Sequence, residues 1–339
     1  MLYMAFNQYN EVIYAQNATK DVGPFYCPKC RQEVVVKRSS RGNLFFSHVQ
    51  QLTKQTAESQ KHKLAKEKLM GWLENDGLFC ESEVYLKDIQ QYPDLLVADP
   101  FNNENRWCIE FQHSSIAAKT LHQRQLGYQR QNLKAQWLLD DETVHTTIPK
   151  WQFNLVQFNP RRGFYLVYYN VTSHKIMIRY DLPIIWPKRK LTYQLVGFSL
   201  FQEGVTDLLD KISTLTCKRR DSQRWKKTAS FAPYALEQLK RNPSCRRYVN
   251  ECYRLGYTID ALPDWIWQLE SKSWAFKEPV WYVLARLLFE ATPQTFDSVY
   301  DHLIYTQQIN YRHLPLLKGS WQRAIRQSMK AFLNGEYIL

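Results

Sequence analysis

The sequence predicts an α/β protein that has a small β unit in front of the α/β region and a mostly helical region behind it. Three observations lead to this prediction. Between residues 56 and 140, helix-like and strand-like segments follow one another in the order α, β, β, β, α, β. Residues 1–50 contain short alternating runs between turn residues, which are typical of strands. From about residue 207 the strand pattern ends and helix-forming segments continue.

The amino-terminal β unit, placed in residues 1–52, is predicted from runs in which apolar and polar residues alternate. Gly23-Pro24 and Arg41-Gly42-Asn43 separate these runs, because both sequences favour turns. The runs are MLYMAF, EVIYAQ, EVVVKR and NLFFSHV.

The α/β core is placed in residues 53–150, and an extension to about residue 205 is left open. A segment rich in helix formers ends near Gly77, which can adopt the left-handed cap conformation. Two later runs, PDLLVADP and RWCIEFQ, flank the polar FNNEN and are expected to pair as a hairpin. Ser114-Ser115 is expected to cap the second helix. The remaining segments of the core are TAESQKHKLAKEKLMGWLEN, ESEVYL, SSIAAKTLHQRQLGYQRQN and AQWLLD.

Beyond residue 150 the chain is rich in aromatic residues, and its runs fit either further strands or amphipathic segments. Residues 206–339 are predicted to form a helical, basic and aromatic-rich domain. The runs that lead to these expectations are WQFNLVQF, GFYLVYYNV, HKIMIRYDL, LTYQLVGFSLF, SCRRYVNECYRLGY and PVWYVLARLLFEAT.

The composition of the 339 residues, with 45% hydrophobic and 23% charged residues, is that of a globular protein and excludes a largely disordered chain. No window approaches the roughly 18 uncharged apolar residues of a membrane span, and the amino terminus lacks the pattern of an export signal. Seven cysteines suit a reducing compartment better than a disulfide framework. We therefore expect a cytoplasmic protein that does not act in a membrane.

The charge balance favours a polyanionic partner. Lys and Arg number 45 against 32 Asp and Glu, which gives a formal net charge of +13. Such an excess attracts nucleic acid through counterion release and electrostatic steering. Membrane-surface proteins and ordinary basic enzymes share this property, so the candidate sites have to decide between these classes.

Cys27 and Cys30 form a C-x2-C pair whose two thiolates can hold one zinc ion, and His48 follows as a third candidate ligand. A fourth ligand is not apparent. Two other interpretations stay open. The cysteines can be an unpaired couple in a turn with His48 in solvent, or a redox dithiol, although the pair does not open a helix after a strand as thioredoxin-type motifs do.

Glu58, His62 and Lys66 follow one another at a spacing of one helical turn on the first predicted helix. Glu58 and His62 share the face of the apolar residues that should pack inward, and Lys66 lies at its margin. A carboxylate on an apolar stripe needs a metal ion or a cationic side chain as partner. The alternative is a helix start in solvent, where Glu58 interacts favourably with the helix dipole.

Asp94 heads one strand of the predicted hairpin, and Glu110 and Gln112 project from one face of the other. Pairing of the strands can bring Asp94 beside Glu110. With no obvious arginine to neutralise them, two such carboxylates are costly unless a divalent cation lies between them. Such a cation can activate water for attack on a phosphodiester. The alternative is an edge hairpin with solvated acids.

Candidate contacts to DNA lie in two places. Arg124 and Tyr128 are one turn apart on the second predicted helix, and Arg124 can reach a phosphate. Lys218–Lys227 contains six Lys or Arg residues, one acid and Trp225, a composition that suits contact with a strand and its bases. A solvated helix surface is the alternative in both places. The candidate DNA-binding residues are Ser114, Arg124, Tyr128, Arg219, Arg220, Arg224 and Lys226.

Taken in order, these residues resemble the CoiA family of competence proteins of naturally transformable Gram-positive bacteria. The pattern occupies Cys27 to Tyr128 and weakens afterwards. The residues that match it are Cys27, Cys30, His48, Glu58, Ser59, His62, Lys66, Pro93, Asp94, Glu110, Gln112, Ser114, Arg124 and Tyr128.

The resemblance implies a PD-(D/E)xK restriction-endonuclease-like fold, in which helices flank a mixed sheet, with a zinc-ribbon-like unit before it and a helical region after it. It also implies that Glu58, Asp94 and Glu110 surround a magnesium or manganese ion. Gln112 stands where the family pattern has lysine, so Lys66 or Lys119 would have to supply the amine, or activity is weak. Where relatives show His-Phe-x-His, this chain has Phe45 to His48, which leaves the zinc site one ligand short unless His62 joins it.

The resulting hypothesis is a cytoplasmic, metal-dependent DNA nuclease that supports recombination of incoming DNA during transformation, on single-stranded or branched DNA and with recombination proteins as partners. Gln112 would position a water or phosphate, and His62 would orient Glu58 or assist proton transfer. Two rival hypotheses are a DNA-binding recombination scaffold that retains the nuclease fold without its chemistry, and a zinc-dependent interaction module without affinity for DNA.

Overall fold

The computed structural model describes residues 3–18, 23–28, 31, 33–38, 44–48, 60–141, 148–186, 188, 191–217, 237 and 239–334. Contacts divide the chain into two compact units, residues 1–60 and 61–339. This division lies close to the predicted domain boundary after residue 52. The predicted boundary at residue 206 does not coincide with a division between these units.

The first unit, residues 1–60, is an antiparallel sheet of five strands in the order β2-β1-β3-β4-β5. Four of these strands fall in the predicted runs, whereas β3 lies outside them. The inward side chains form a small core that includes Ala5, Phe25, Val34 and Phe46. The strands are β1 (Met4–Asn7), β2 (Val12–Tyr14), β3 (Phe25–Tyr26), β4 (Glu33–Arg38) and β5 (Leu44–His48).

The second unit, residues 61–339, contains a mixed sheet in the order β13-β12-β11-β9-β8-β7-β6, with β10 paired to β11. β9 runs parallel to β8 and to β11, and the other neighbours are antiparallel. Its strands are β6 (Phe79–Ser82), β7 (Leu95–Asp99), β8 (Asn102–Gln112), β9 (Lys134–Asp140), β10 (Gln157–Asn159), β11 (Gly163–Asn170), β12 (Lys175–Tyr180) and β13 (Gln194–Ser199).

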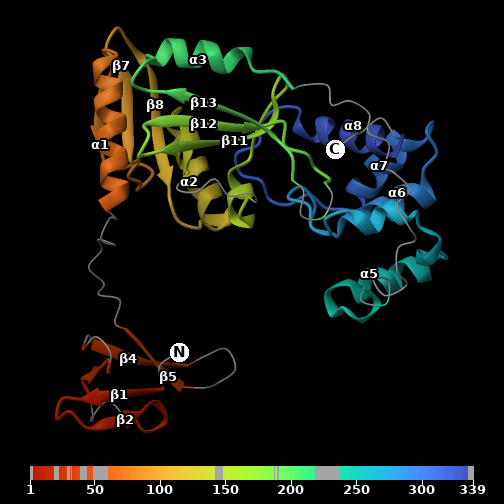
Figure 1. The fold of residues 1–339 in the computed structure, drawn as a ribbon, viewed down its shortest axis with the longest axis horizontal. Helices are drawn as coiled ribbons and strands as arrows, with labels where there is room; N and C mark the ends of the chain where they lie inside the picture. Colours follow the sequence, from red (N-terminus) through yellow and green to blue (C-terminus); the bar gives the residue numbers. More distant parts are fainter. Residues whose placement is uncertain are drawn as a thin grey trace. The chain divides into compact units, whose positions relative to one another are not determined.

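Helices cover both faces of this sheet. α1 (Gln60–Asn75) lies along β7 and β8, and its Leu69 packs in the same cluster as Leu95 and Ile109 (Figure 1). α2 (Ala118–Arg130) covers the opposite face, where Leu121 and Tyr128 share a cluster with Trp137. The side chains of β8 alternate between these faces, so its neighbours Ile109 and Glu110 face different helices.

The helical region that follows packs into the α2 side of the sheet. One continuous cluster of buried side chains contains Leu96 and Trp137 of the sheet together with Trp281, Leu303 and Met329 of the last helices. The other α-helices among the described residues, labelled in Figure 1, are α3 (Val205–Thr214), α5 (Pro243–Arg254), α6 (Val280–Glu290), α7 (Phe296–Tyr305) and α8 (Trp321–Leu333).

The predicted mixed α/β architecture and the order α, β, β, β, α, β are confirmed by α1, β6, β7, β8, α2 and β9. The hairpin is also confirmed, because β7 and β8 are antiparallel neighbours. The expected cap at Ser114-Ser115 is wrong, because α2 begins at Ala118 and Ala117 occupies the cap position without a side-chain hydrogen bond.

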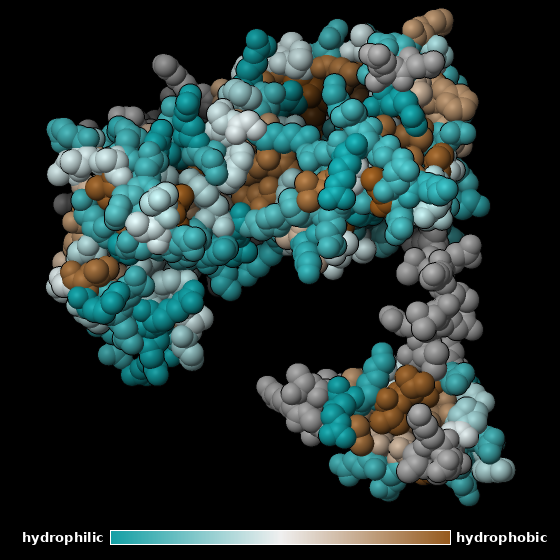
Figure 2. All heavy atoms as spheres, turned by 180° about the vertical axis from the view of Figure 1, so that it is seen from behind, coloured by the Kyte–Doolittle hydropathy of each residue, from teal (hydrophilic) through white to brown (hydrophobic). Residues whose placement is uncertain are grey.

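Hydrophilic residues cover much of the face of residues 61–339 seen in Figure 2, with apolar patches between them. Within the described ranges, no helix has the length and apolar character needed to cross a membrane.

Candidate active site at the end of the central hairpin

The candidate site lies where β7 begins and β8 ends. Leu95 of β7 pairs with Ile109 of β8, so Asp94, which directly precedes β7, comes opposite Glu110. β8 and β9 are parallel, and parallel strands end at the same edge of a sheet. The register that pairs Gln112 with Leu139 therefore brings Gln112 and Asp140 to this edge as well. The first turns of α1 supply His62 beside them.

Asp94 is fixed by a backbone group and a side chain. Its Oδ2 atom accepts a hydrogen bond of 2.7 Å from the backbone N–H of Phe111, and His62 Nε2 lies 3.1 Å from the same oxygen. The His62 ring stacks on Phe111, with 5.8 Å between the ring centroids. His62 therefore contacts Asp94 in this arrangement. The predicted pairing of His62 with Glu58 stays a prediction, because Glu58 lies outside the described residues.

Glu110 is almost completely buried, with 2% of its surface exposed. Both of its carboxylate oxygens accept from the guanidinium of Arg124, at 2.6 and 2.7 Å, and the Tyr128 hydroxyl donates to one of them. The pKa of Glu110 is raised to about 8. Burial is the largest cause, the charge of Arg124 lowers this pKa, and the charge of Asp94 raises it. The cost of removing this carboxylate from water is thus only partly offset by Arg124.

Arg124 corrects the expectation that no arginine neutralises the two acids. It projects from α2 toward the sheet, contacts the Trp137 ring at 5.5 Å, and donates to the Tyr92 carbonyl at 3.2 Å. Arg124 and Tyr128 are one helical turn apart, so both reach Glu110 from the same helix face. The Tyr128 side chain is 0% exposed because it packs in the core. It therefore cannot contact DNA directly in this structure, and the prediction that it binds DNA is wrong.

The remaining predicted residues near the site make local contacts. Gln112 Nε2 donates to the Ser114 carbonyl at 2.6 Å, which holds the turn after β8. Lys66 is buried on α1, and its Nζ lies 2.6 Å from Glu83 Oε1. Lys66 is thus engaged outside the Asp94–Glu110 pair, and Lys119 is an exposed residue of α2.

One pair at this edge was missed by the sequence analysis. Lys61 Nζ lies 2.7 Å from Asp140 Oδ1, and the Asp140 side chain is only 8% exposed. The signal was present in the run AQWLLD, whose acid ends a buried strand. This acid can be placed at the site only once β9 is known to run parallel to β8, because the two strands then end at the same edge of the sheet.

Several predicted site residues lie outside the described residues: Glu58, Cys30, Arg219, Arg220, Arg224 and Lys226. Of the predicted zinc ligands, Cys27 is buried after β3 and His48 is the last residue of β5. β3 and β5 flank β4, where Val34 pairs with both Phe25 and His48. A zinc ion held by Cys27, Cys30 and His48 stays a prediction.

The donor atoms of Asp94 and Glu110 match a magnesium or manganese ion in type, because both metals prefer carboxylate oxygens. Burial raises the pKa of Glu110, and a positive charge nearby favours its ionised form. Among the residues that the structure describes, no group of three acidic, histidine or cysteine side chains converges as a metal site. A metal at Glu110 would compete with Arg124, and a third ligand would have to come from outside the described residues.

Comparison with known proteins assigns the segment that contains this site. Residues 58–212 match the family described as "Competence protein CoiA, nuclease-like domain". Over this segment the chain is CoiA-like. The competence protein CoiA of Bacillus subtilis (strain 168) is 26% identical over 162 residues. This match covers 42% of the chain and 42% of the relative, so the chain spans about two-fifths of the length of that CoiA protein. No solved structure gives a significant match.

The CoiA-like segment includes β6 to β13 and both helices that border the candidate site. The match begins at Glu58 and includes Asp94, Glu110 and Gln112, in agreement with the resemblance derived from their order. It confirms a nuclease-like domain within the mixed α/β unit, and it leaves the role of each side chain to experiment.

Proposed function

We propose that this CoiA-like chain is a metal-dependent DNA nuclease that processes incoming DNA for recombination during competence, in the cytoplasm and together with recombination proteins. The observation that carries the proposal is the placement of Asp94 and buried Glu110 at one sheet edge within the nuclease-like segment. The restriction-endonuclease-like arrangement of the sheet and the magnesium or manganese ion belong to the same proposal.

In this proposal each residue of the site has a separate role. Asp94 and Glu110 bind the metal, with Glu58 as third ligand, and a metal bound there supplies Lewis acidity and lowers the pKa of a water molecule. His62 and the Phe111 N–H hold the Asp94 carboxylate in one orientation. Arg124 moves from Glu110 to a phosphate of the substrate, since its side chain is 29% exposed and can reach solvent.

The test is DNA cleavage by the purified chain in magnesium, in manganese and in excess chelator. We expect cleavage only with metal, and a fall of roughly 10²- to 10³-fold in the Asp94→Asn variant, because electrostatic stabilisation at the reacting phosphate is lost. Glu81→Gln is the matched control, because it neutralises an exposed carboxylate on neighbouring β6 and should keep full activity. Equal cleavage by the wild type and Asp94→Asn contradicts the proposal.

A second function, a DNA-binding scaffold without cleavage, is favoured by one specific observation. The guanidinium of Arg124 already neutralises Glu110, and Gln112 uses its amide on the Ser114 carbonyl. If the wild type binds DNA but leaves single-stranded, nicked and branched DNA intact with either metal, the scaffold is the correct function.

Exposed aromatic rings beside the site favour single-stranded DNA as substrate. Tyr85 and Tyr92 stack with 4.7 Å between their ring centroids, and they are 49% and 55% exposed. Tyr92 precedes Asp94 by two residues, and its carbonyl accepts from Arg124. Unpaired bases stack on such rings, whereas the bases of a duplex are already stacked on one another.

The double variant Tyr85→Ser/Tyr92→Ser is therefore expected to bind single-stranded DNA about tenfold more weakly, since base stacking on an aromatic ring contributes about 1–3 kcal/mol. Fluorescence anisotropy in chelator, where no cleavage occurs, measures this affinity. Tyr305→Ser removes an exposed tyrosine at the end of α7, at 87% exposure, and should change nothing. An unchanged affinity of the double variant would mean that these rings do not contact the strand.

A further inference from the structure

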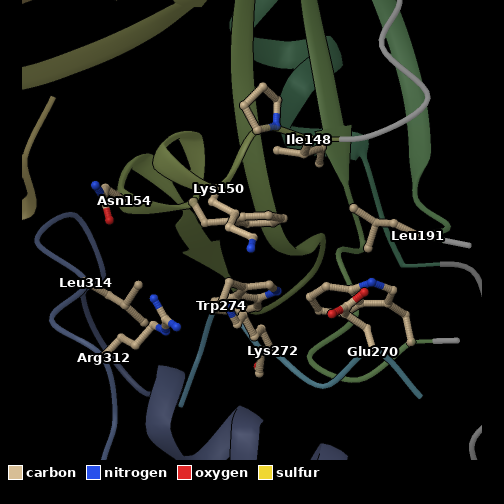
Figure 3. Close-up of a pocket in the computed structure, with 13 residues that line it drawn as sticks. Ile148, Lys150, Asn154, Leu191, Glu270, Lys272, Trp274, Arg312 and Leu314 are labelled. Atoms are coloured by element: carbon tan, nitrogen blue, oxygen red, sulfur yellow. The ribbon is translucent and has the colours of Figure 1, made fainter. Parts of the chain in front are cut away.

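A cavity lined by none of the candidate active-site residues lies within the unit of residues 61–339 (Figure 3). It is formed where segments that follow β9 meet the segments before α6 and after α7. It has a volume of about 380 Å³, which is in the range of pockets that hold small organic ligands. Its walls come from the 3-10 helix Lys150–Leu155, from the segment around Trp186, and from residues 270–274 and 312–314. We call it the cation-rimmed pocket.

Aromatic rings form one wall of the cation-rimmed pocket. Phe153 stacks between Trp186 and Trp274, at 6.3 Å from each ring centroid, and its plane is only 10° from that of Trp274. The Trp274 indole is fixed further, because its Nε1 atom donates to the Pro183 carbonyl at 2.8 Å. A rigid wall of parallel rings is suited to a flat, unsaturated ligand.

Three cations stand at the rim, namely Lys150, Lys272 and Arg312, and all three are exposed. No carboxylate among the described residues forms an ion pair with any of them. Arg312 is held in place, because its Nε atom donates to the Phe276 carbonyl at 2.8 Å. Figure 3 shows Lys150 and Arg312 reaching toward Trp274 from different segments. Positively charged side chains at the rim of a pocket attract an anion.

Glu270 is the acid of the pocket and lies apart from Arg312. Its backbone N–H donates to the Trp186 carbonyl at 2.8 Å, which fixes its position beside that ring. Figure 3 places Glu270 on the other side of Trp274 from Arg312. The pocket is therefore polar at both ends, with positive charge at one end, a carboxylate at the other, and aromatic rings between them.

We propose that the cation-rimmed pocket binds a nucleotide, with its phosphate on Lys150, Lys272 and Arg312 and its base against the Trp186–Trp274 wall. The Glu270 carboxylate accepts hydrogen bonds from the amino group of adenine, cytosine or guanine, which thymine lacks. The nucleotide is either free or part of a DNA strand, because both present the same base and phosphate. This proposal does not depend on cleavage by the candidate active site, since none of its residues belongs to that site.

The test measures binding to the full chain in chelator, where cleavage does not contribute. The probes are the four deoxynucleoside monophosphates, by isothermal calorimetry, and short single-stranded oligonucleotides, by fluorescence anisotropy. In the Lys150→Gln/Lys272→Gln variant we expect the affinity for the bound probe to fall about tenfold or more, because two charge-assisted contacts are lost. Lys134→Gln/Arg254→Gln removes two exposed positive charges elsewhere on the same unit and should change the affinity less than about twofold.

Two further readouts make the result specific to the pocket. A Glu270→Gln variant should reduce the preference for adenine, cytosine and guanine over thymine while leaving phosphate binding in place. Photocrosslinking with 8-azidodeoxyadenosine, which keeps the amino group, should label the peptides that contain Trp186 or Trp274. Binding of monophosphates alone identifies a free nucleotide as the ligand, and binding of oligonucleotides with crosslinks in the pocket identifies a strand.

The proposal is overturned if neither probe binds the wild type, or if the Lys150→Gln/Lys272→Gln variant binds as tightly as the wild type. It is also overturned if all crosslinks fall at the candidate active site. Failure of cleavage with intact binding in the pocket would reject the proposed nuclease alone, so the two proposals are tested separately.

Discussion

Arg124→Met is expected to destabilise the unit of residues 61–339 by about 1–3 kcal/mol, because buried Glu110 loses its cationic partner and has to take up a proton to stay in the core. Glu110 is 2% exposed and accepts from Arg124 through both oxygens. Methionine keeps most of the length and apolar stem of arginine, so the lost charge and hydrogen bonds dominate the effect. Urea unfolding followed by circular dichroism measures the change in the free energy of unfolding.

The double variant Arg124→Met/Glu110→Gln distinguishes charge compensation from general damage to α2. A neutral amide at position 110 no longer needs a cation, so the double variant should recover a large part of the lost stability. Arg130→Met, at the exposed end of the same helix, is the control and should cost less than about 0.5 kcal/mol. Equal losses in the single and double variants would show that Arg124 does not stabilise the protein through Glu110.

Trp137→Ala is expected to cost about 3–5 kcal/mol, for a different reason. Trp137 of β9 is 1% exposed, and its removal leaves a cavity that the surrounding side chains cannot close. Its Nε1 atom also donates to Gln125 Oε1 at 2.9 Å, so the change leaves the buried Gln125 amide without this donor. The Arg124 guanidinium loses the ring at 5.5 Å on which it rests.

Thermal and urea unfolding of Trp137→Ala and Trp137→Phe measure this effect. Phenylalanine refills much of the volume but lacks the indole N–H, so its loss should be clearly smaller than that of alanine. A Trp137→Ala protein as stable as the wild type would show that this part of the core collapses around the missing ring. Such an outcome would contradict the tight packing of α2 against β9.

The sequence was sufficient for the hairpin and for the placement of two acids. The runs around FNNEN are rich in strand-forming residues, and strand periodicity fixes which residues share a face, so Asp94 opposite Glu110 followed from pairing alone. The contact between Arg124 and Glu110 could not be derived in the same way. It depends on how α2 lies across the sheet, which is decided by packing of the whole unit and leaves no local pattern.

Dependence on tertiary packing also explains the other differences between the sequence predictions and the structure. Tyr128 carries a polar hydroxyl on a helix rich in polar residues, so only the packed structure shows that its ring is buried. Ser114-Ser115 has the composition of a helix cap, but the chain continues in an extended form to Ala117 before the helix begins. Lys61 and Asp140 meet because α1 begins at the edge where the parallel strands β8 and β9 end, and a parallel pairing has no short-range signature.

The continuous cluster that joins the sheet to the last helices has a genetic consequence. Ile325 and Met329 of α8 are 0% and 1% exposed within the cluster that contains Trp137. A stop codon ahead of α8 would therefore expose the interior of the nuclease-like segment and send the product to cellular proteases. Phenotypes caused by late nonsense or insertion alleles should be interpreted as loss of the protein, and measured abundance should accompany every such phenotype.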